Sequence, residues 1–251
     1  MYTNKYFIPT GIQSLDAIIG GLEPGKLTFV ASKPGQGKTA FITNVIANTA
    51  VSQHIQTVFF SIEIGKNSLF ERLVGKCCNI KIAQLREGYF SKEQYQQIIQ
   101  PTLEKLQKSA LYIDDTPAID IEEICRKTRR LHKELSQTGT KLKLLAIDSF
   151  QLIKGAPKNT NHILGKLREL AQELQIAVLI PVQCKQQFTG SPSNLLDLFP
   201  ASMQIFSNEL LIFIQKTQRE NELNIVFHSE HSIRTQLNVH FNQECGIITD
   251  K

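Results

Sequence analysis

The sequence predicts an α/β fold in which a mainly parallel sheet is covered by helices and extended by antiparallel strands at one edge. Up to residue 183, short apolar runs alternate with longer amphipathic stretches, and this strand–helix order is typical of parallel sheets. Most of the short runs are continuous in Val, Ile, Leu and Phe, as expected for strands buried on both faces. After residue 205 strand-like runs follow one another without helices.

Each predicted element follows from one of these patterns. The apolar runs predict strands at residues 27–31, 57–63, 111–115, 142–148, 177–183 and 210–216. The amphipathic stretches predict helices at residues 38–52, 68–78, 91–108, 121–135 and 161–175. The fourth helix has a defined start, because Asp120 is a suitable N-cap and Glu123 follows at the spacing of a capping box.

The C-terminal part of the chain is expected to form hairpins at one edge of the sheet. Strand-like runs separated by short gaps lie there at residues 210–216, 223–229 and 236–242. Before them, residues 185–200 hold Gly190, Pro192 and Pro200 among polar residues and predict a mobile loop. No repeat, low-complexity segment or linker interrupts the pattern, so we interpret residues 1–251 as a single domain.

Composition excludes several classes of protein. Of the 251 residues, 41% are hydrophobic and 20% charged, as is ordinary for a globular chain. No apolar run reaches the roughly 18 residues of a membrane helix, and no signal peptide is visible, so a cytoplasmic location is expected. The five cysteines include the adjacent pair Cys77 and Cys78 but no CxxC motif, which predicts free thiols rather than a zinc site or disulfides. The net charge of +5 permits nucleic-acid binding without requiring it.

A phosphate-binding loop follows the first predicted strand. The segment from Ser32 to Thr39 matches the P-loop pattern GxxxxGK[ST], except that Ser32 replaces the first glycine. Gly35 and Gly37 let backbone N–H groups turn toward one point, where the next helix adds the partial positive charge of its N-terminus. Lys38 is expected to reach the β- and γ-phosphates, and the Thr39 hydroxyl to coordinate Mg²⁺. The predicted nucleotide-binding residues are Ser32, Lys33, Pro34, Gly35, Gln36, Gly37, Lys38, Thr39 and Ala40.

A P-loop also requires a carboxylate for the metal at the end of another strand, and two segments offer one. Asp148 follows four apolar residues, and Asp114 with Asp115 follows a similar run. Ligands of open α/β sheets bind at the carboxyl ends of the strands, where such a carboxylate would hold Mg²⁺ directly or through water. An aspartate at this position can also simply cap a turn, and the local pattern does not choose between the two segments.

Two other strand ends carry side chains suited to ATP hydrolysis. Glu63 ends the run 57–63, where a carboxylate could orient and deprotonate the attacking water. Gln183 ends the run 177–183, where a neutral amide could sense the γ-phosphate by hydrogen bonding. Both indications are weak by themselves, since a polar side chain at a strand end is usually only solvated. With Lys38, these two residues form the predicted catalytic set.

Taken together, these motifs resemble the C-terminal motor domain of the DnaB family of replicative helicases. Their order and spacing fit from about residue 9 to residue 183. The segments that carry the resemblance are residues 10–16, 20–22, 25–27, 34–39, 60–63, 112–117, 147–152 and 170–174. RadA-like and KaiC-like ATPases share the opening TGI…LD…GGL but are not expected to carry LYIDDTP and IDxxQL together, so we regard them as a minor alternative.

The resemblance implies a RecA-like core, ATP with Mg²⁺, and usually a six-membered ring that moves on single-stranded DNA. It implies that Lys38 and Thr39 contact phosphate and metal, that Glu63 is the catalytic carboxylate and that Gln183 is the sensor. It also implies that the metal acid is Asp148 rather than Asp114.

The departures from the family pattern lie outside this stretch. Residues 199–206 do not match the family's DNA-binding loop, and Lys185 with Gln186 replaces an Asn-Arg pair. The best alignment of the family's KxRNG motif puts His228, Glu230 and His231 there, so a glutamate replaces the arginine finger. Such a finger contributes about 10³–10⁵ in rate, although Arg219 or Arg234 could act from a shifted position. Only nine residues precede Thr10, so no N-terminal DnaB domain is expected.

Basic residues concentrate in one stretch of the chain, between Arg126 and Lys143. They could bind phosphates, although a solvated outer face is the more ordinary explanation. We therefore expect a Mg²⁺-dependent ATPase of the helicase type, acting on single-stranded DNA in replication or repair. The alternative is a nucleotide-binding regulator with weakened catalysis that pairs with a complete DnaB helicase.

Overall fold

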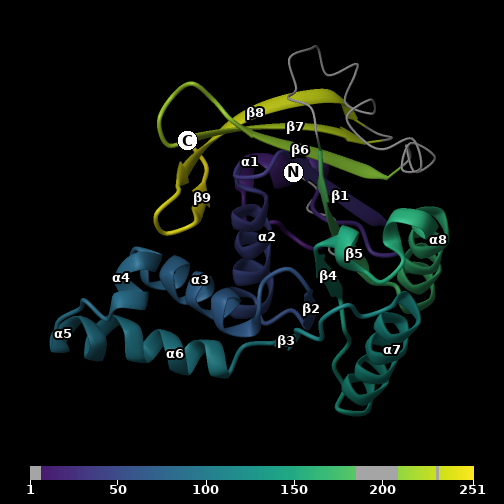
Figure 1. Ribbon diagram of the computed structural model, residues 1–251, viewed down its shortest axis with the longest axis horizontal. Coiled ribbons are helices and arrows are strands. Elements are labelled where there is room, and N and C mark those ends of the chain that lie inside the picture. Colours follow the sequence, from purple (N-terminus) through teal and green to yellow (C-terminus); the bar gives the residue numbers. More distant parts are fainter. Residues whose placement is uncertain (1–6, 185–208, 230–231) are drawn as a thin grey trace.

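The computed structural model describes residues 7–184, 209–229 and 232–251. The strands within these ranges form one nine-stranded sheet in the order β3-β2-β4-β5-β1-β6-β7-β8-β9 (Figure 1). The strands are β1 (Leu27–Ser32), β2 (Thr57–Ser61), β3 (Leu111–Asp114), β4 (Leu144–Asp148), β5 (Ala177–Gln183), β6 (Leu210–Lys216), β7 (Glu222–Ser229), β8 (Ser232–Asn242) and β9 (Ile247–Thr249).

The sheet is parallel from β3 to β6 and antiparallel from β6 to β9. This confirms the predicted parallel sheet with an antiparallel C-terminal edge. β1 lies between β5 and β6, so the segment that follows β1 emerges near the middle of the carboxyl edge. The short strand β9 adds to β8 and was not predicted, because a run of three residues carries too little pattern to identify.

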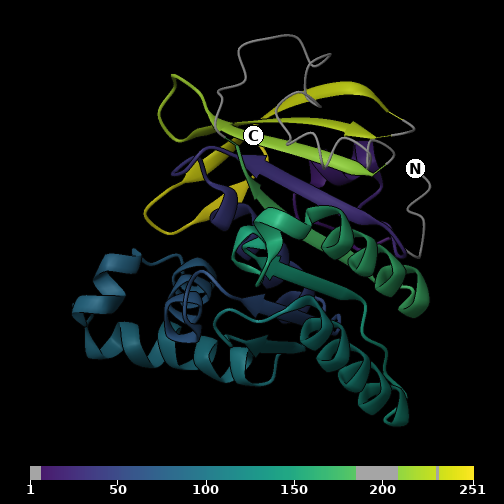
Figure 2. The same ribbon diagram turned by 45° about the vertical axis from the view of Figure 1, so that its right-hand side comes forward.

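Helices cover both faces of the sheet (Figures 1 and 2). One face packs against α7 and α8, and the other against α2 and α3. Along β1, Phe29 packs on the side of α7 and α8, and Val30 packs on the side of α2. The apolar run is therefore buried on both faces, as predicted. The helices are α1 (Gln13–Ile19), α2 (Lys38–Ile46), α3 (Lys66–Cys78), α4 (Ile82–Glu87), α5 (Lys92–Gln94), α6 (Gln100–Gln107), α7 (Ile121–Gln137) and α8 (Ala156–Leu174).

Several predicted boundaries were wrong. β2 ends at Ser61, so Glu63 lies two residues beyond its strand, and β4 begins at Leu144 instead of residue 142. The predicted helix 38–52 changes to a π-helical segment at Ala47, and the predicted helix 91–108 is α5 and α6 joined by another π-helical segment. α8 begins five residues earlier than predicted, with non-helical backbone at Asn159. Periodicity locates the apolar face of a helix but not these local changes in winding.

Two short helices, α1 and α4, were not predicted. The backbone N–H groups of Gln13 and Ser14, at the start of α1, donate to the Asp250 carboxylate over 2.8 Å each. Because the capping residue lies at the far end of the chain, the sequence next to α1 contains no capping motif that would predict the helix. The Asp120 N-cap of α7 was predicted correctly, because its carboxylate accepts a hydrogen bond of 2.8 Å from the Glu123 N–H. The Glu123 side chain does not complete a capping box but pairs with Arg126.

The cysteines and the hydropathy agree with the expectations from composition. All five cysteines are free thiols, and Cys77 is the exposed one. None of the helices that the structure describes combines the length and the apolar composition needed to cross a bilayer.

Candidate active site

The P-loop connects β1 to α2 at the carboxyl edge of the sheet. Ser32 is buried at the end of β1, in register with Gln183 at the end of β5. Gly35 and Gly37 adopt φ of +73° and +99°, the left-handed region that glycine favours. α2 then begins at Lys38, so its N-terminus faces the loop. A β-carbon on Gly37 would come within 3.1 Å of the Leu223 side chain, which would have to shift slightly to admit it.

The Gln36 side chain anchors the loop to β6. Its Oε1 accepts a hydrogen bond of 2.8 Å from the Lys216 N–H, and the Lys216 Nζ donates to Gln243 over 2.7 Å. Gln36 and the buried Ser32 therefore support the loop instead of lining its cavity. The other predicted nucleotide-binding residues line the cavity, namely Lys33, Pro34, Gly35, Gly37, Lys38, Thr39 and Ala40.

The cavity over the P-loop has a volume of about 390 Å³. Glu63, beyond β2, and Gln183, at the end of β5, also line it, so residues from three strand ends meet there. A cavity of about 730 Å³ adjoins it at the turn between β6 and β7. The two share Lys216, Phe241 and Gln243.

Asp148 lies beside this cavity, fully buried at the end of β4. Its backbone carbonyl accepts hydrogen bonds from the N–H groups of Ile62 and Glu63, at 2.6 and 2.9 Å. These bonds hold Glu63 next to Asp148, although Glu63 does not belong to the strand. Burial and the negative charge of Glu63 raise the pKa of Asp148 to about 6, against the opposing charge of Lys38.

The residues around Asp148 fit a magnesium ion. Neither oxygen of its buried carboxylate has a hydrogen-bond partner among the described residues, and such a group is costly without a cation or donor. Thr39 brings a hydroxyl to the same cavity. Two protein ligands are enough for Mg²⁺ at a nucleotide site, where phosphates and waters complete its shell.

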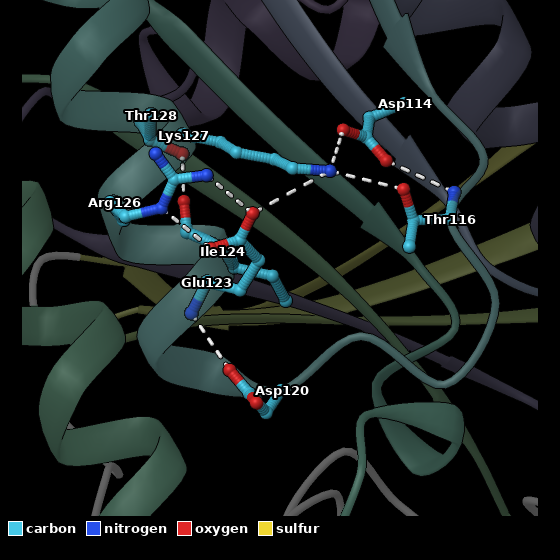
Figure 3. A network of polar contacts seen from close by, with 8 residues as sticks. All are labelled: Asp114, Thr116, Asp120, Glu123, Ile124, Arg126, Lys127 and Thr128. Atoms are coloured by element: carbon cyan, nitrogen blue, oxygen red, sulfur yellow. Dashed lines mark hydrogen bonds and ion pairs between the residues drawn. The ribbon is translucent and has the colours of Figure 1, made fainter.

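Asp114, the other candidate for the metal acid, does not line the cavity. It belongs to a polar network at the start of α7 (Figure 3). Its carboxylate accepts hydrogen bonds from the Lys127 Nζ at 2.6 Å and the Thr116 N–H at 3.0 Å. Partial burial raises the pKa of Asp114, but these bonds outweigh it and leave the pKa below its ordinary value. Asp115 accepts a bond from the Lys66 N–H at 3.1 Å. Both aspartates therefore serve the fold.

The basic stretch of α7 is mostly neutralised. Arg126 pairs with Glu123, Arg129 with Glu173, and Arg130 with Glu134, all on exposed surface, and Lys127 pairs with Asp114. These pairs favour the solvated face over a phosphate-binding surface.

Sequence reasoning missed several residues of the cavity, of which Arg72 on α3 and Lys216 on β6 carry charge. Both come from segments without a motif, and only the fold brings them to the P-loop. Other predicted features, namely the mobile loop 185–200, the pair Lys185 and Gln186, the stretch 199–206, and Glu230 with His231, lie outside the described residues. The side chain of Arg234 lies outside them as well, while Arg219 is exposed at the β6–β7 turn, 3.8 Å from Glu222.

Comparisons with known proteins place this chain in a family. The family model for the DnaB-like helicase C terminal domain matches residues 7–194. The chain is 34% identical over 176 residues to the replicative DNA helicase DnaB of Nostoc sp., and 34% identical over 179 residues to the replicative DNA helicase DnaC of Bacillus subtilis. Each match covers 68% of this chain, but 20% of the Nostoc protein and 38% of the Bacillus protein.

The fold is also that of a known helicase. A solved DnaB-like replicative helicase, described with its interactions with primase, superposes with a TM-score of 0.84 at 19% identity, covering 97% of this chain and 62% of that one. The RecA-like core implied by the family resemblance is therefore confirmed. With its family model matched over most of its length, the chain belongs to the family of DnaB-like helicase C-terminal domains.

Proposed function

We propose that this chain is the motor domain of a replicative DNA helicase, which binds ATP with Mg²⁺ and couples its hydrolysis to single-stranded DNA. One observation carries the proposal. The P-loop, Glu63 and Gln183 line a single cavity, and the buried, unpartnered carboxylate of Asp148 lies beside it. Residues 1–251 would form one RecA-like ATPase domain.

The P-loop residues would bind the phosphates of the nucleotide. N–H groups around Gly35 and Gly37 and the N-terminus of α2 would hold the α- and β-phosphates, and the Lys38 ammonium would reach the β- and γ-phosphates. The adjoining cavity at the β6–β7 turn offers space for the nucleoside. Its position beside Lys216 places it next to the phosphate cavity.

The strand ends would carry out the hydrolysis. The Thr39 hydroxyl and the Asp148 carboxylate would hold Mg²⁺, which when bound neutralises charge on the terminal phosphate. Glu63, held next to Asp148 by the backbone bond to its carbonyl, would orient the attacking water and accept its proton. The Gln183 amide would donate a hydrogen bond to the γ-phosphate and report whether it is present.

The motor is favoured over a nucleotide-binding regulator, because the relatives named above are replicative helicases. As in the family, we infer a ring of six copies on single-stranded DNA. A complete DnaB helicase as partner belongs to the regulator hypothesis, and no observation on the described residues favours it.

Steady-state ATP hydrolysis with and without single-stranded DNA tests the motor. We expect DNA-stimulated turnover that Lys38→Ala abolishes, whereas Lys166→Ala, on the exposed side of α8 beside Glu169, leaves it unchanged. Turnover that persists in Lys38→Ala, or that DNA does not stimulate, would contradict the proposal. Mass photometry of the full chain with ATP and DNA tests the ring, and a monomer under all conditions would contradict that part.

A further inference from the structure

The two aspartates that follow one another after β3 contact two different helices. The Asp114 carboxylate accepts a hydrogen bond from the Lys127 Nζ on α7 (Figure 3). The carboxylate of Asp115, the next residue, accepts a hydrogen bond of 3.1 Å from the Lys66 N–H, at the first residue of α3. The short segment that follows β3 is therefore held between the two helices, with Asp115 on the side of α3.

Asp115 supplies a cap that α3 lacks in its own sequence. The N-cap residue of α3 is Gly65, which has no side chain, and no acidic residue lies in the first turn. The first N–H groups of a helix have no partner within it, and the helix dipole also favours a negative charge there. The carboxylate that meets this need comes from the end of the neighbouring strand, β3, which pairs with β2.

The cap lies close to the residue proposed to activate the attacking water. Lys66 comes three residues after Glu63, at the end of the short connection between β2 and α3. At the other end, the N–H groups of Ile62 and Glu63 donate hydrogen bonds to the Asp148 carbonyl. The Glu63 side chain itself is exposed, so packing against the core does not fix it. Its position therefore depends on backbone contacts at both ends of the connection, one to Asp148 and the other to Asp115.

We infer that Asp115 is a positioning residue for ATP hydrolysis, because it fixes the start of α3 and so holds the connection that carries Glu63 to the cavity. The inference rests on the catalytic role proposed above for Glu63. Without the cap, the first turn of α3 can fray, and the flexible backbone at Gly65 lets the connection follow. A displacement of about 1 Å in an active site can lower the rate by about 10²-fold. The P-loop belongs to another connection, between β1 and α2, so phosphate binding should not change.

The difference between the effects on kcat and on nucleotide affinity tests this assignment. For Asp115→Ala we expect kcat of DNA-stimulated ATP hydrolysis to fall by about tenfold to a hundredfold, with unchanged affinity for a non-hydrolysable ATP analogue. Asp115→Asn should retain most of the activity, because asparagine caps a helix about as well as aspartate. Asp120→Ala is the matched control, since it removes the equivalent cap from α7. It should lower the stability to urea and leave kcat unchanged.

A double variant separates positioning of Glu63 from a general loss of structure. Glu63→Gln removes the group that Asp115 positions, so adding Asp115→Ala should cause no further loss of kcat. An unmodified chain without ATP hydrolysis, or full activity in Glu63→Gln, would overturn the proposed catalysis together with this inference.

Other outcomes would overturn the role of Asp115 alone. If the unmodified chain is active and Glu63→Gln is impaired, these outcomes are an unchanged kcat in Asp115→Ala, a parallel loss of nucleotide affinity, or a full additional loss of kcat in the double variant. Should Asp115→Ala fail to fold, as judged by circular dichroism, Asp115→Glu decides. Glutamate is not among the preferred cap residues, and its longer side chain displaces the carboxylate, so kcat should still fall. An unchanged kcat would overturn the inference.

Discussion

Two strand ends that look alike in the sequence hold aspartates in opposite environments. Asp148, at the end of β4, is fully buried with both carboxylate oxygens unpartnered among the described residues, and its pKa is raised to about 6. Asp114, at the end of β3, accepts hydrogen bonds from Lys127 and Thr116, and its pKa is lowered. The comparison teaches that a charged group without a partner at a cavity indicates a binding site, while a paired one indicates support of the fold.

The largest expected effect is on ATP hydrolysis, and it distinguishes Glu63, beside Asp148, from Glu123, beside Asp114. Glu63→Gln should lower the kcat of ATP hydrolysis by about 10²–10⁴, because an amide cannot accept the proton of the attacking water. Nucleotide affinity should be retained. Steady-state kinetics beside equilibrium binding measures both.

Glu123→Gln is the matched control for that change, since Glu123 lies next to Asp114 in the network on α7. It should leave hydrolysis close to that of the unmodified chain. Full activity in Glu63→Gln would show that Glu63 is only a solvated side chain.

Replacing each aspartate by asparagine should give the next largest effect on hydrolysis. Asp148→Asn should reduce hydrolysis by about 10²–10³, the usual cost of removing one charge-stabilising group, and raise the Mg²⁺ concentration required. Asp114→Asn should leave both quantities unchanged. A Mg²⁺ titration of the activity of each variant makes the comparison, and equal losses in the two would remove the distinction between them.

The raised pKa of Asp148 predicts a dependence of stability on pH in the absence of metal. Folding raises this pKa from 3.8 to about 6, so the folded chain binds the proton more tightly than the unfolded chain. The stability that comes from the protonated form is complete below pH 3.8 and is lost as the pH rises through about 6.

Asp148→Asn should keep that stability at neutral pH. With EDTA present, its free energy of unfolding should exceed that of the unmodified chain by about 1–3 kcal/mol near pH 7.5, and the difference should vanish near pH 4. Urea denaturation at a series of pH values measures this. A variant that is less stable at neutral pH would mean that an undetected partner already satisfies Asp148.

The smallest effect is that of Asp114 on stability, and its dependence on pH is opposite to that of Asp148. Its lowered pKa means that its contribution is present above pH 3.8 and is lost as the pH falls below that value. Because the pair with Lys127 is partly exposed, Asp114→Asn should cost less than about 1 kcal/mol at neutral pH, and less at high salt. Denaturation at two salt concentrations tests this, and a loss that salt does not change would point to packing instead of charge.

Local patterns in the sequence were sufficient for much of this protein. The buried strands, the P-loop and the Asp120 cap were predicted because each depends on residues close together along the chain. The strands are continuous apolar runs, and the P-loop has glycines that permit positive φ. The cap is a carboxylate that accepts a hydrogen bond from the N–H three residues later. The same local patterns could not choose Asp148 over Asp114, and that choice came from resemblance to a family.

Only the tertiary structure decided which charged groups are left without partners. Lys127 reaches Asp114 from α7, and the backbone of Asp148 positions Glu63 from another strand. Arg72 reaches the cavity from α3, and Asp250 caps α1 from the far end of the chain. Solvation and charge pairing depend on distances in space between segments far apart in sequence, so no run of neighbouring residues can encode them.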